Sequence, residues 1–323
     1  MKRMILRIRW MSFVFLMMPF GLGVEKTGQI PKISEEALMM PKASQSLLLD
    51  VTREGSTLAA VGERGHILVS TDSGENWVQA HVPSHVTLTG VSFVNDKTGW
   101  AVGHNETILK TTDGGLNWTL VQQNLDKDPF LDVWFENEQH GIITGAYGVL
   151  YVTYDGGKNW EERFVNEEDD MHLNQIASSP SGKLYIAAEM GMAYKSTDNG
   201  ETWQAMNMPY EGSFFGVLPL KSERVLMFGL RGHVFLSEDF GESWEEIQSK
   251  TNTLLNCGLE TENGAVLIGG MGGTYLKSSD NGKTFSLNKH DSQRGISSMT
   301  EVTPDRVLYV GEKGMHPISA SHQ

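Results

Sequence analysis

The chain has 323 residues, 39 % of them hydrophobic, and its 26 Lys and Arg against 40 Asp and Glu give a formal net charge of −14. This charge argues against a nucleic-acid surface, which needs Lys and Arg clustered on one face, and against adhesion to an anionic bilayer. Its 35 glycines and the lack of a long helical period favour an all-β chain.

Residues 1–23 have the layout of a secretory signal peptide. Four basic residues between Lys2 and Arg9 precede an apolar run from Trp10 to Phe20, and small residues follow it. The run is too short to span a bilayer as a helix. We therefore expect an exported protein, periplasmic or membrane-associated on the extracytoplasmic side. We expect no direct membrane insertion of the mature chain, and whether the segment is cleaved stays open.

A repeat with a period of about 42 residues fills most of the remaining chain. The phrase AAVGERGHILVSTDSGENW, which ends at Trp77, recurs as WAVGHNETILKTTDGGLNW, which ends at Trp118. Four further copies end in an aromatic residue at a similar interval, and a truncated seventh copy starts at Val307. Such regular self-similarity is the signature of a repeat architecture.

Each copy reads as four short strands. In the second copy we expect these strands at Leu88–Val94, Gly99–Gly103, Ile108–Thr112 and Trp118–Gln122. Four antiparallel strands in each repeat make one propeller blade, and closure of the ring removes the bare edges of an open stack. The sequence thus predicts a seven-bladed β-propeller over residues 47–318, with a C-terminal tail at 319–323.

The seventh copy, Ile296–Ile318, holds only three strands. Residues 24–46 form an N-terminal segment, and Gln29–Met40 within it precede the first blade. We predict that this stretch pairs with the strand around Pro317. It would then supply the fourth strand of the last blade and close the ring.

The six complete copies share the pattern Ser/Thr-x-Asp-x-Gly-x-x-aromatic between the third and fourth strands. The Asp carboxylate is expected to accept hydrogen bonds from turn amides, the glycine to take a positive φ, and the aromatic ring to pack between blades. With one per blade, the carboxylates cannot share a metal ion or a proton, so we predict a structural role and no metal site. The residues are Asp72, Asp113, Asp155, Asp198, Asp239, Asp280, Trp77, Trp118, Trp160, Trp203, Trp244 and Phe285.

These boxes resemble those of the BNR/Asp-box repeat superfamily, which includes sialidases and xyloglucanases. The phrases GWAVG at Gly99–Gly103 and ILKTTDGGLNW at Ile108–Trp118 resemble most closely the photosystem II stability/assembly factor family and its bacterial relatives. The resemblance covers residues from about 47 to 318. It implies a non-catalytic propeller that docks on a membrane-protein complex during assembly.

The turns between the second and third strands lie on the face opposite the Asp boxes, where glycines flank two variable positions. Variable polar loops on a rigid scaffold are where recognition usually resides. We therefore predict a partner-binding face at Arg64, His104, Tyr147, Arg231 and Lys313.

The residues give only weak support to an enzymatic function. A sialidase needs clustered arginines and a tyrosine nucleophile, and Tyr147 with Arg64 and Arg231 is the best available set. A xyloglucanase needs a cleft between two propellers, whereas this chain encodes one. The single cysteine, Cys257, cannot form an internal disulfide and is expected in the core.

The function that we predict is that of an exported, monomeric scaffold without cofactor that binds a membrane-protein complex, its unassembled subunit or another cell-envelope protein. The alternatives are a carbohydrate-active enzyme or lectin that uses the same loop face, and a purely structural envelope subunit. An exposed aromatic cluster near the ring's centre would favour sugar binding, whereas charged, aromatic-poor loops would favour protein docking.

Overall fold

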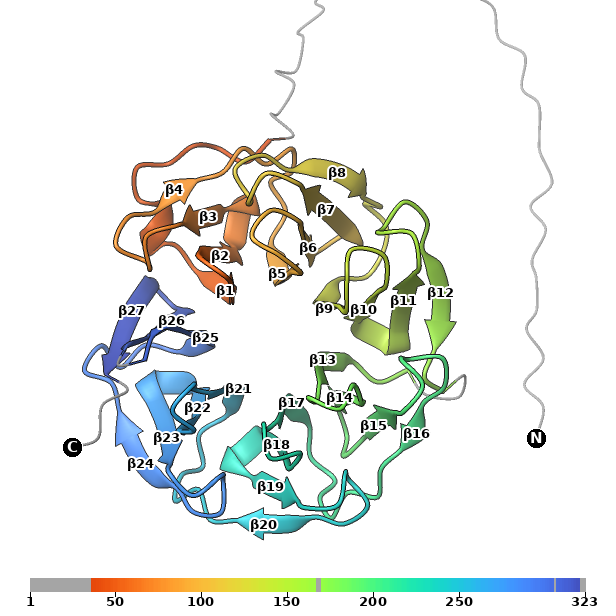
Figure 1. Ribbon diagram of the computed structural model, residues 1–323, viewed down its shortest axis with the longest axis vertical. Coiled ribbons are helices and arrows are strands. Elements are labelled where there is room, and N and C mark those ends of the chain that lie inside the picture. Colours follow the sequence, from red (N-terminus) through yellow and green to blue (C-terminus); the bar gives the residue numbers. More distant parts are fainter. Residues whose placement is uncertain (1–35, 167–169, 305, 320–323) are drawn as a thin grey trace, which may run out of the picture. The chain divides into compact units, whose positions relative to one another are not determined.

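A computed structural model describes residues 36–166, 170–304 and 306–319. The predicted signal peptide, the first part of the predicted closing segment (residues 29–35) and residues 320–323 lie outside this range. The described chain forms seven antiparallel sheets arranged around a common axis (Figure 1). The predicted seven-bladed β-propeller is thereby confirmed. In the described ranges, no helix combines the length and the apolar character that crossing a bilayer requires.

Blades 1 to 6 each have four strands, paired in sequence order from the ring's axis outward. Blade 1 contains β1 (Leu48–Glu54), β2 (Thr57–Gly62), β3 (Ile67–Ser70) and β4 (Val78–Gln79). Blade 2 contains β5 (Leu88–Phe93), β6 (Gly99–Gly103), β7 (Thr107–Thr111) and β8 (Thr119–Gln122). Blade 3 contains β9 (Phe130–Phe135), β10 (Gly141–Gly145), β11 (Val149–Thr153) and β12 (Glu161–Phe164).

The second half of the ring repeats this arrangement. Blade 4 contains β13 (Leu173–Ser178), β14 (Leu184–Ala188), β15 (Ala193–Ser196) and β16 (Gln204–Ala205). Blade 5 contains β17 (Phe214–Pro219), β18 (Val225–Gly229), β19 (Val234–Ser237) and β20 (Glu245–Ile247). Blade 6 contains β21 (Leu255–Glu260), β22 (Val266–Gly270), β23 (Thr274–Ser278) and β24 (Ser286–Lys289). Among the described residues, blade 7 contains three strands, β25 (Ile296–Thr303), β26 (Arg306–Gly311) and β27 (Gly314–Ser319).

The core lies between the blades, because each sheet packs both of its faces against neighbours. The second strand of a blade is therefore buried on both sides, as the continuous burial of β6 and β18 shows. This packing explains why these strands read as unbroken apolar runs such as GWAVG and not as alternating sequences. The fourth strands are exposed at the rim, as in β8 and β16.

The first and last blades close the ring through side chains. Ser298 Oγ on β25 donates to Asp50 Oδ1 on β1 at 2.8 Å. Arg53 donates to the carbonyl of Glu301 at 3.1 Å, and the Arg306 guanidinium binds the Glu75 carboxylate and the Ser73 carbonyl. These contacts hold the seam between blades 7 and 1 without a shared strand among the described residues.

The predicted closing strand is not found in the part of its segment that the structure describes. Ala37 N–H donates to the carbonyl of Val82, and the Gln79 side chain bonds both Leu38 and Met40. Residues 36–40 therefore lie on blade 1, not beside Pro317. The 3-10 turn η1 (Ala43–Gln45) then approaches the start of β27. For residues 36–40 the prediction was wrong, since backbone and glutamine hydrogen bonds fix them to the first blade.

Candidate functional site

The turns between the second and third strands share one backbone design in all seven blades. The N–H of the residue that follows the second strand donates to the carbonyl of the residue that precedes the first strand of the same blade. Examples are Glu63 to Leu47 at 3.0 Å and Leu230 to Ser213 at 3.0 Å. Since every blade has the same strand order, these turns all lie on one face of the ring. We call them the tip turns.

A glycine precedes the tip turn in six of the seven blades, and Ala188 takes this place in blade 4. Gly62 and Gly229 are extended, with φ −176° and 176°, so a left-handed conformation is not the reason for glycine there. A Cβ on Gly62 would lie 2.2 Å from the Leu47 carbonyl oxygen, and one on Gly229 2.4 Å from that of Ser213. At Gly62 and Gly229 the close approach of the incoming chain leaves no room for a Cβ, whereas blade 4 makes the same hydrogen bond with Ala188 at this position. Our sequence-based reason, a tight hairpin, was incomplete.

The central residue of a tip turn adopts the left-handed conformation. Arg64, Tyr147, Met190, Arg231 and Lys313 have φ between 55° and 65°. A side chain in this conformation is unfavourable, by about 1 kcal/mol or more, whereas glycine adopts it freely. Only blade 6 places a glycine here, Gly272 with φ 63°. Six of the seven tip turns therefore keep a side chain at a conformational cost.

The structure places four of the five predicted binding residues at equivalent positions, namely Arg64, Tyr147, Arg231 and Lys313. The fifth, His104, stands one position earlier, and Asn105 occupies the equivalent place in blade 2 with φ 59°. All five predicted side chains are exposed. They come from blades 1, 2, 3, 5 and 7 and surround the ring's axis without converging on one point.

The cations and the carboxylates of the tip turns behave differently. Glu63 accepts a hydrogen bond from Leu47 N–H, and Glu312 accepts one from Gly295 N–H at 3.0 Å. In the part of the chain that the structure describes, Arg64, Arg231 and Lys313 form no salt bridge. The acids thus fold back onto the backbone while the cations project into solvent. The tip turns thus carry both charges, since a carboxylate that accepts a hydrogen bond keeps its charge.

Two apolar tips were missed as candidates from the sequence. Met190 is 64 % exposed and Met271 is 43 % exposed, on the same face as Tyr147, which is 55 % exposed. Flexible methionine side chains adapt to varied partner surfaces. Their place at variable turn positions was a usable signal, but their exposure could not be predicted from it.

Histidines from neighbouring segments support two of the tips. The Tyr147 ring packs edge-on against His172 at 4.8 Å, and His172 Nδ1 lies 3.3 Å from the Glu189 carboxylate. Beside Arg231, a polar pocket of 260 Å³ contains His233, whose Nδ1 lies 2.6 Å from Glu246. These contacts hold rings in place next to exposed side chains.

The grouping expected for a sialidase does not form. Tyr147, Arg64 and Arg231 belong to blades 3, 1 and 5, and no contact joins any two of them among the described residues. In the same residues, no three His, Cys, Asp or Glu side chains converge as a metal site would need. The residues named for a sialidase therefore do not form one site.

The Asp-box turns use their polar groups internally. In the first box, Asp72 Oδ1 accepts hydrogen bonds from Ser70 Oγ at 2.7 Å and Asn76 N–H at 2.9 Å, and Oδ2 accepts one from Asn76 Nδ2 at 2.8 Å. The other five boxes repeat this pattern, as in Asp239, which bonds Ser237 and Ser243.

These hydrogen bonds lower the pKa of the box carboxyls. The bonds from Asn76 lower the pKa of Asp72 to about 2, and those from Ser243 lower the pKa of Asp239 to about 2. Hydrogen bonding to the charged form is the physical cause. The box carboxylates thus accept hydrogen bonds within the turns that they stabilise.

Two aspartates on the inner strands were not singled out from the sequence. Asp50 Oδ2 accepts Val91 N–H at 2.9 Å, and Asp132 Oδ2 accepts Ile176 N–H at 3.0 Å, so each links its blade to the next. Burial and then the nearby Asp50 charge raise the pKa of Asp132 to about 8. Both stand at β-bulges of the first strand, a position that a sequence pattern does not mark. Cys257 is buried, and burial raises the pKa of its thiol to about 12.

Solved structures share this fold. The chain has a TM-score of 0.71 and 21 % identity to a structure described as YCF48 bound to D1 peptide, with 88 % of this chain and 96 % of that chain covered. YCF48 from Cyanidioschyzon merolae gives 0.68 at 16 % identity, with coverages of 87 % and 96 %. The WD40 propeller domain of Doa1 gives 0.68 at 10 % identity, with coverages of 90 % and 96 %.

No curated protein matches the sequence. The model of one protein family does match it, over residues 69–129 and 116–253, which is more than half of the chain. That family is described as the photosynthesis system II assembly factor YCF48. The repeats, the seven blades and this match together show that the chain belongs to the YCF48 assembly factor family.

Proposed function

We propose that this protein is an exported, non-catalytic assembly protein whose tip turns dock on an unassembled membrane-protein subunit. Membership of an assembly factor family supports a binding role. One similar structure is described as YCF48 bound to D1 peptide, which supports a polypeptide as the ligand class. The layout of residues 1–23 supports export.

The conformation of the tip turns carries the proposal. Six turns hold a side chain in the left-handed region where glycine would be more stable. Salt bridges do not account for these side chains, because Arg64, Arg231 and Lys313 form none among the described residues. Strained residues that persist at one repeated position support a functional surface.

The chemistry of the tips favours a protein partner over a sugar. Lectins stack aromatic rings on sugar faces, but Tyr147 is the only aromatic residue at the centre of a tip turn among the described residues. Three cations and two exposed methionines surround it on the face. A partner with acidic and apolar residues would complement this surface. A sugar ligand remains the alternative outcome of the experiment.

Affinity capture from detergent-solubilised cell envelopes tests the proposal. The tagged parent should retain a discrete membrane protein, and the triple variant Arg64→Ala, Arg231→Ala, Lys313→Ala should lose it. The control is Lys97→Ala, Lys158→Ala, Lys283→Ala, which removes the same charge from exposed positions on the opposite face. If both triple variants retain the protein equally, the tip turns are not the docking face. Recovery of envelope carbohydrate alone would support the lectin alternative.

A further inference from the structure

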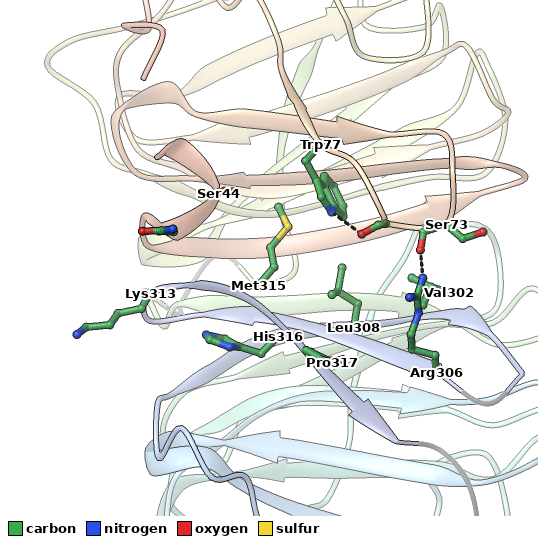
Figure 2. A pocket seen from close by; sticks show the side chains of 12 residues that line it. Ser44, Ser73, Trp77, Val302, Arg306, Leu308, Lys313, Met315, His316 and Pro317 are labelled. Carbon is green, nitrogen blue, oxygen red and sulfur yellow. Dashed lines mark hydrogen bonds between the residues drawn. The ribbon is translucent and has the colours of Figure 1, made fainter. Parts of the chain in front are cut away.

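A groove of 830 Å³ lies between blades 7 and 1, and Figure 2 shows the side chains that line it. The chain's own Ser44 and Gln45 are among the lining residues, and Met40 packs in the same apolar cluster as Trp77. The residues before blade 1 therefore already contribute to this seam. A second cavity, of 220 Å³, lies between blades 4 and 5 and is lined by those two blades.

Three polar residues form a row across the face of blade 4 that meets blade 5. Tyr185 of β14 is the direct cross-strand partner of Lys195 of β15, and Lys195 is in turn paired with Gln204 of β16. Lys195 Nζ donates to the Phe240 carbonyl at 3.4 Å and to the Glu242 carboxylate at 2.5 Å, both in the Asp box of blade 5. The cavity lies between this row and that box.

At the equivalent seam between blades 2 and 3, both inner members of the row reach the neighbouring box. Trp100 and Lys110 are cross-strand partners there, as Tyr185 and Lys195 are in blade 4. Both donate to the Gly156 carbonyl, at 3.3 Å and 2.8 Å. The Tyr185 side chain is fully buried, but its hydroxyl has no hydrogen-bond partner among the described residues. Because buried polar groups are normally hydrogen-bonded, this hydroxyl is suited to a ligand in the cavity.

The Tyr185 hydroxyl acts as a hydrogen-bond donor. Burial, followed by the charge of Glu223, raises the pKa of Tyr185 to about 12, so the hydroxyl keeps its proton at neutral pH. The Glu223 carboxylate itself accepts a hydrogen bond from Ser181 Oγ at 2.7 Å and does not line the cavity. A ligand that meets Tyr185 should therefore carry an acceptor oxygen.

The charged groups of the lining differ in their partners. The Asp239 carboxylate accepts hydrogen bonds from Ser243 N–H at 2.9 Å and from Ser243 Oγ within its own box, and Glu242 is paired with Lys195. Lys183 forms no salt bridge in the part of the chain that the structure describes. Its ammonium is the charge of the lining that an anionic ligand can pair with.

Phe240 holds the wall of the cavity in an unfavourable conformation. Its φ is 60°, and a bulky side chain in the left-handed region is rare. The other boxes place small or amide side chains here, namely Ser73, Gly114, Gly156, Asn199 and Asn281. The Phe240 ring lies under Lys183, whose Nζ is 3.1 Å from the ring centroid. Strain at a wall residue that orients a free cation supports a binding site.

We propose that the cavity between blades 4 and 5 binds a small carboxylate, which accepts a hydrogen bond from the Tyr185 hydroxyl and pairs with the Lys183 ammonium. Hydrogen bonds to an ionised acceptor are the stronger kind, so these two donors together favour a carboxylate over a neutral amide. The cavity volume of 220 Å³ limits the ligand to a few carbon atoms. The site is independent of docking at the tip turns, which lie on the opposite face.

Saturation-transfer NMR on the purified chain tests the proposal, with propionate as the probe and propionamide as its neutral isostere at equal ionic strength. We expect propionate to bind more tightly than propionamide. Tyr185→Phe, which removes only the hydroxyl, should weaken propionate binding about tenfold, and Lys183→Met should also weaken it. Tyr275→Phe in blade 6 removes a hydroxyl outside the cavity and should leave binding unchanged.

Thermal unfolding shows whether each variant is folded. Equal binding of propionate and propionamide, or equal propionate binding by the parent and a folded Tyr185→Phe variant, would overturn the proposal. Without ligand, Tyr185→Phe should be at least as stable as the parent, because it removes a buried hydroxyl that lacks a partner. A less stable variant, with no propionate binding by the parent, would mean that water occupies the cavity. The capture experiment does not bear on these outcomes, since its triple variant alters only the tip turns.

Discussion

Each blade presents two kinds of turn on opposite faces, and the chain uses them differently. The Asp-box turns repeat both their backbone and their side chains, and Asp72 or Asp239 finds all its partners inside its own turn. The tip turns repeat the backbone, but their side chains vary and the cations stay unpaired. The side chains of the Asp-box turns, which are the same in each blade, therefore stabilise the fold. The side chains of the tip turns, which vary on a constant backbone, form an exposed surface.

The largest expected loss of stability comes from a substitution at the glycine that precedes a tip turn. Gly229→Val places a Cβ 2.4 Å from the Ser213 carbonyl oxygen and 2.8 Å from Phe214 Cα. Because both neighbours are backbone atoms, we expect a loss of about 3 kcal/mol in the free energy of unfolding. Urea denaturation measures it. A variant as stable as the parent would show that the close approach is not a constraint.

A smaller loss is expected from an Asp box. Asp113→Ala removes the acceptor for Thr111 Oγ1, Asn117 N–H and Asn117 Nδ2. We expect the free energy of unfolding to fall by about 1 to 2 kcal/mol, with capture of the partner unchanged. The same denaturation assay and the capture assay check the two halves. Loss of capture in a folded variant would mean that the box face also contacts the partner.

A gain in stability is expected from a substitution at the centre of a tip turn. Arg231→Gly relieves a left-handed side chain with φ 56°, so the free energy of unfolding should rise by about 1 kcal/mol. A rise of about 2 °C in Tm follows for a chain of this size. Capture of the partner should weaken at the same time. If the Arg231→Gly variant were more stable and still captured the partner fully, strain at this turn would be unrelated to binding.

The smallest effects are expected from pH. The box carboxyls have lowered pKa values in the folded state, about 2 for Asp239, so their stabilisation is present above about pH 4 and lost as pH falls toward 2. Asp132, whose pKa is raised to about 8, acts in the reverse direction: folded protein binds its proton more tightly, and stability falls as pH rises from about 4 toward 8.

We expect the effect of Asp132 to be a few degrees in Tm for a chain of this size. Tm measured from pH 5 to 8 should decline gently in the parent and less in Asp132→Asn. Parallel curves for the two proteins would mean that another group causes the decline.

The sequence predicted the elements whose chemistry repeats. The spacing from Trp77 to Trp118 and onward fixed the number of blades, and strands such as Gly99–Gly103 lie where their apolar runs placed them. The strand order follows from the same repeat, because each blade has identical turn chemistry. This is why the ring could be predicted without knowledge of any contact.

Features that differ from blade to blade were harder to predict from the sequence. The course of residues 36–40 depends on single hydrogen bonds to Val82 and Gln79 that have no counterpart in other blades. In blade 2 the central tip position is Asn105, which follows Gly103 by two residues as Arg64 follows Gly62, and His104 is the other variable position of that turn. The inner aspartates act across blades, over more than 40 residues, through bulges that no local pattern reveals.

Site-specific photo-crosslinking tests most directly whether the tip turns are the docking face. A photoreactive phenylalanine analogue would replace Tyr147 or Met271 on the tip face, and Leu116 or Phe240 on the Asp-box face, all of which are exposed. After irradiation of intact cells, we predict an adduct with one membrane protein from the tip positions and none from the box positions. Adducts from Leu116 or Phe240 alone would contradict the account.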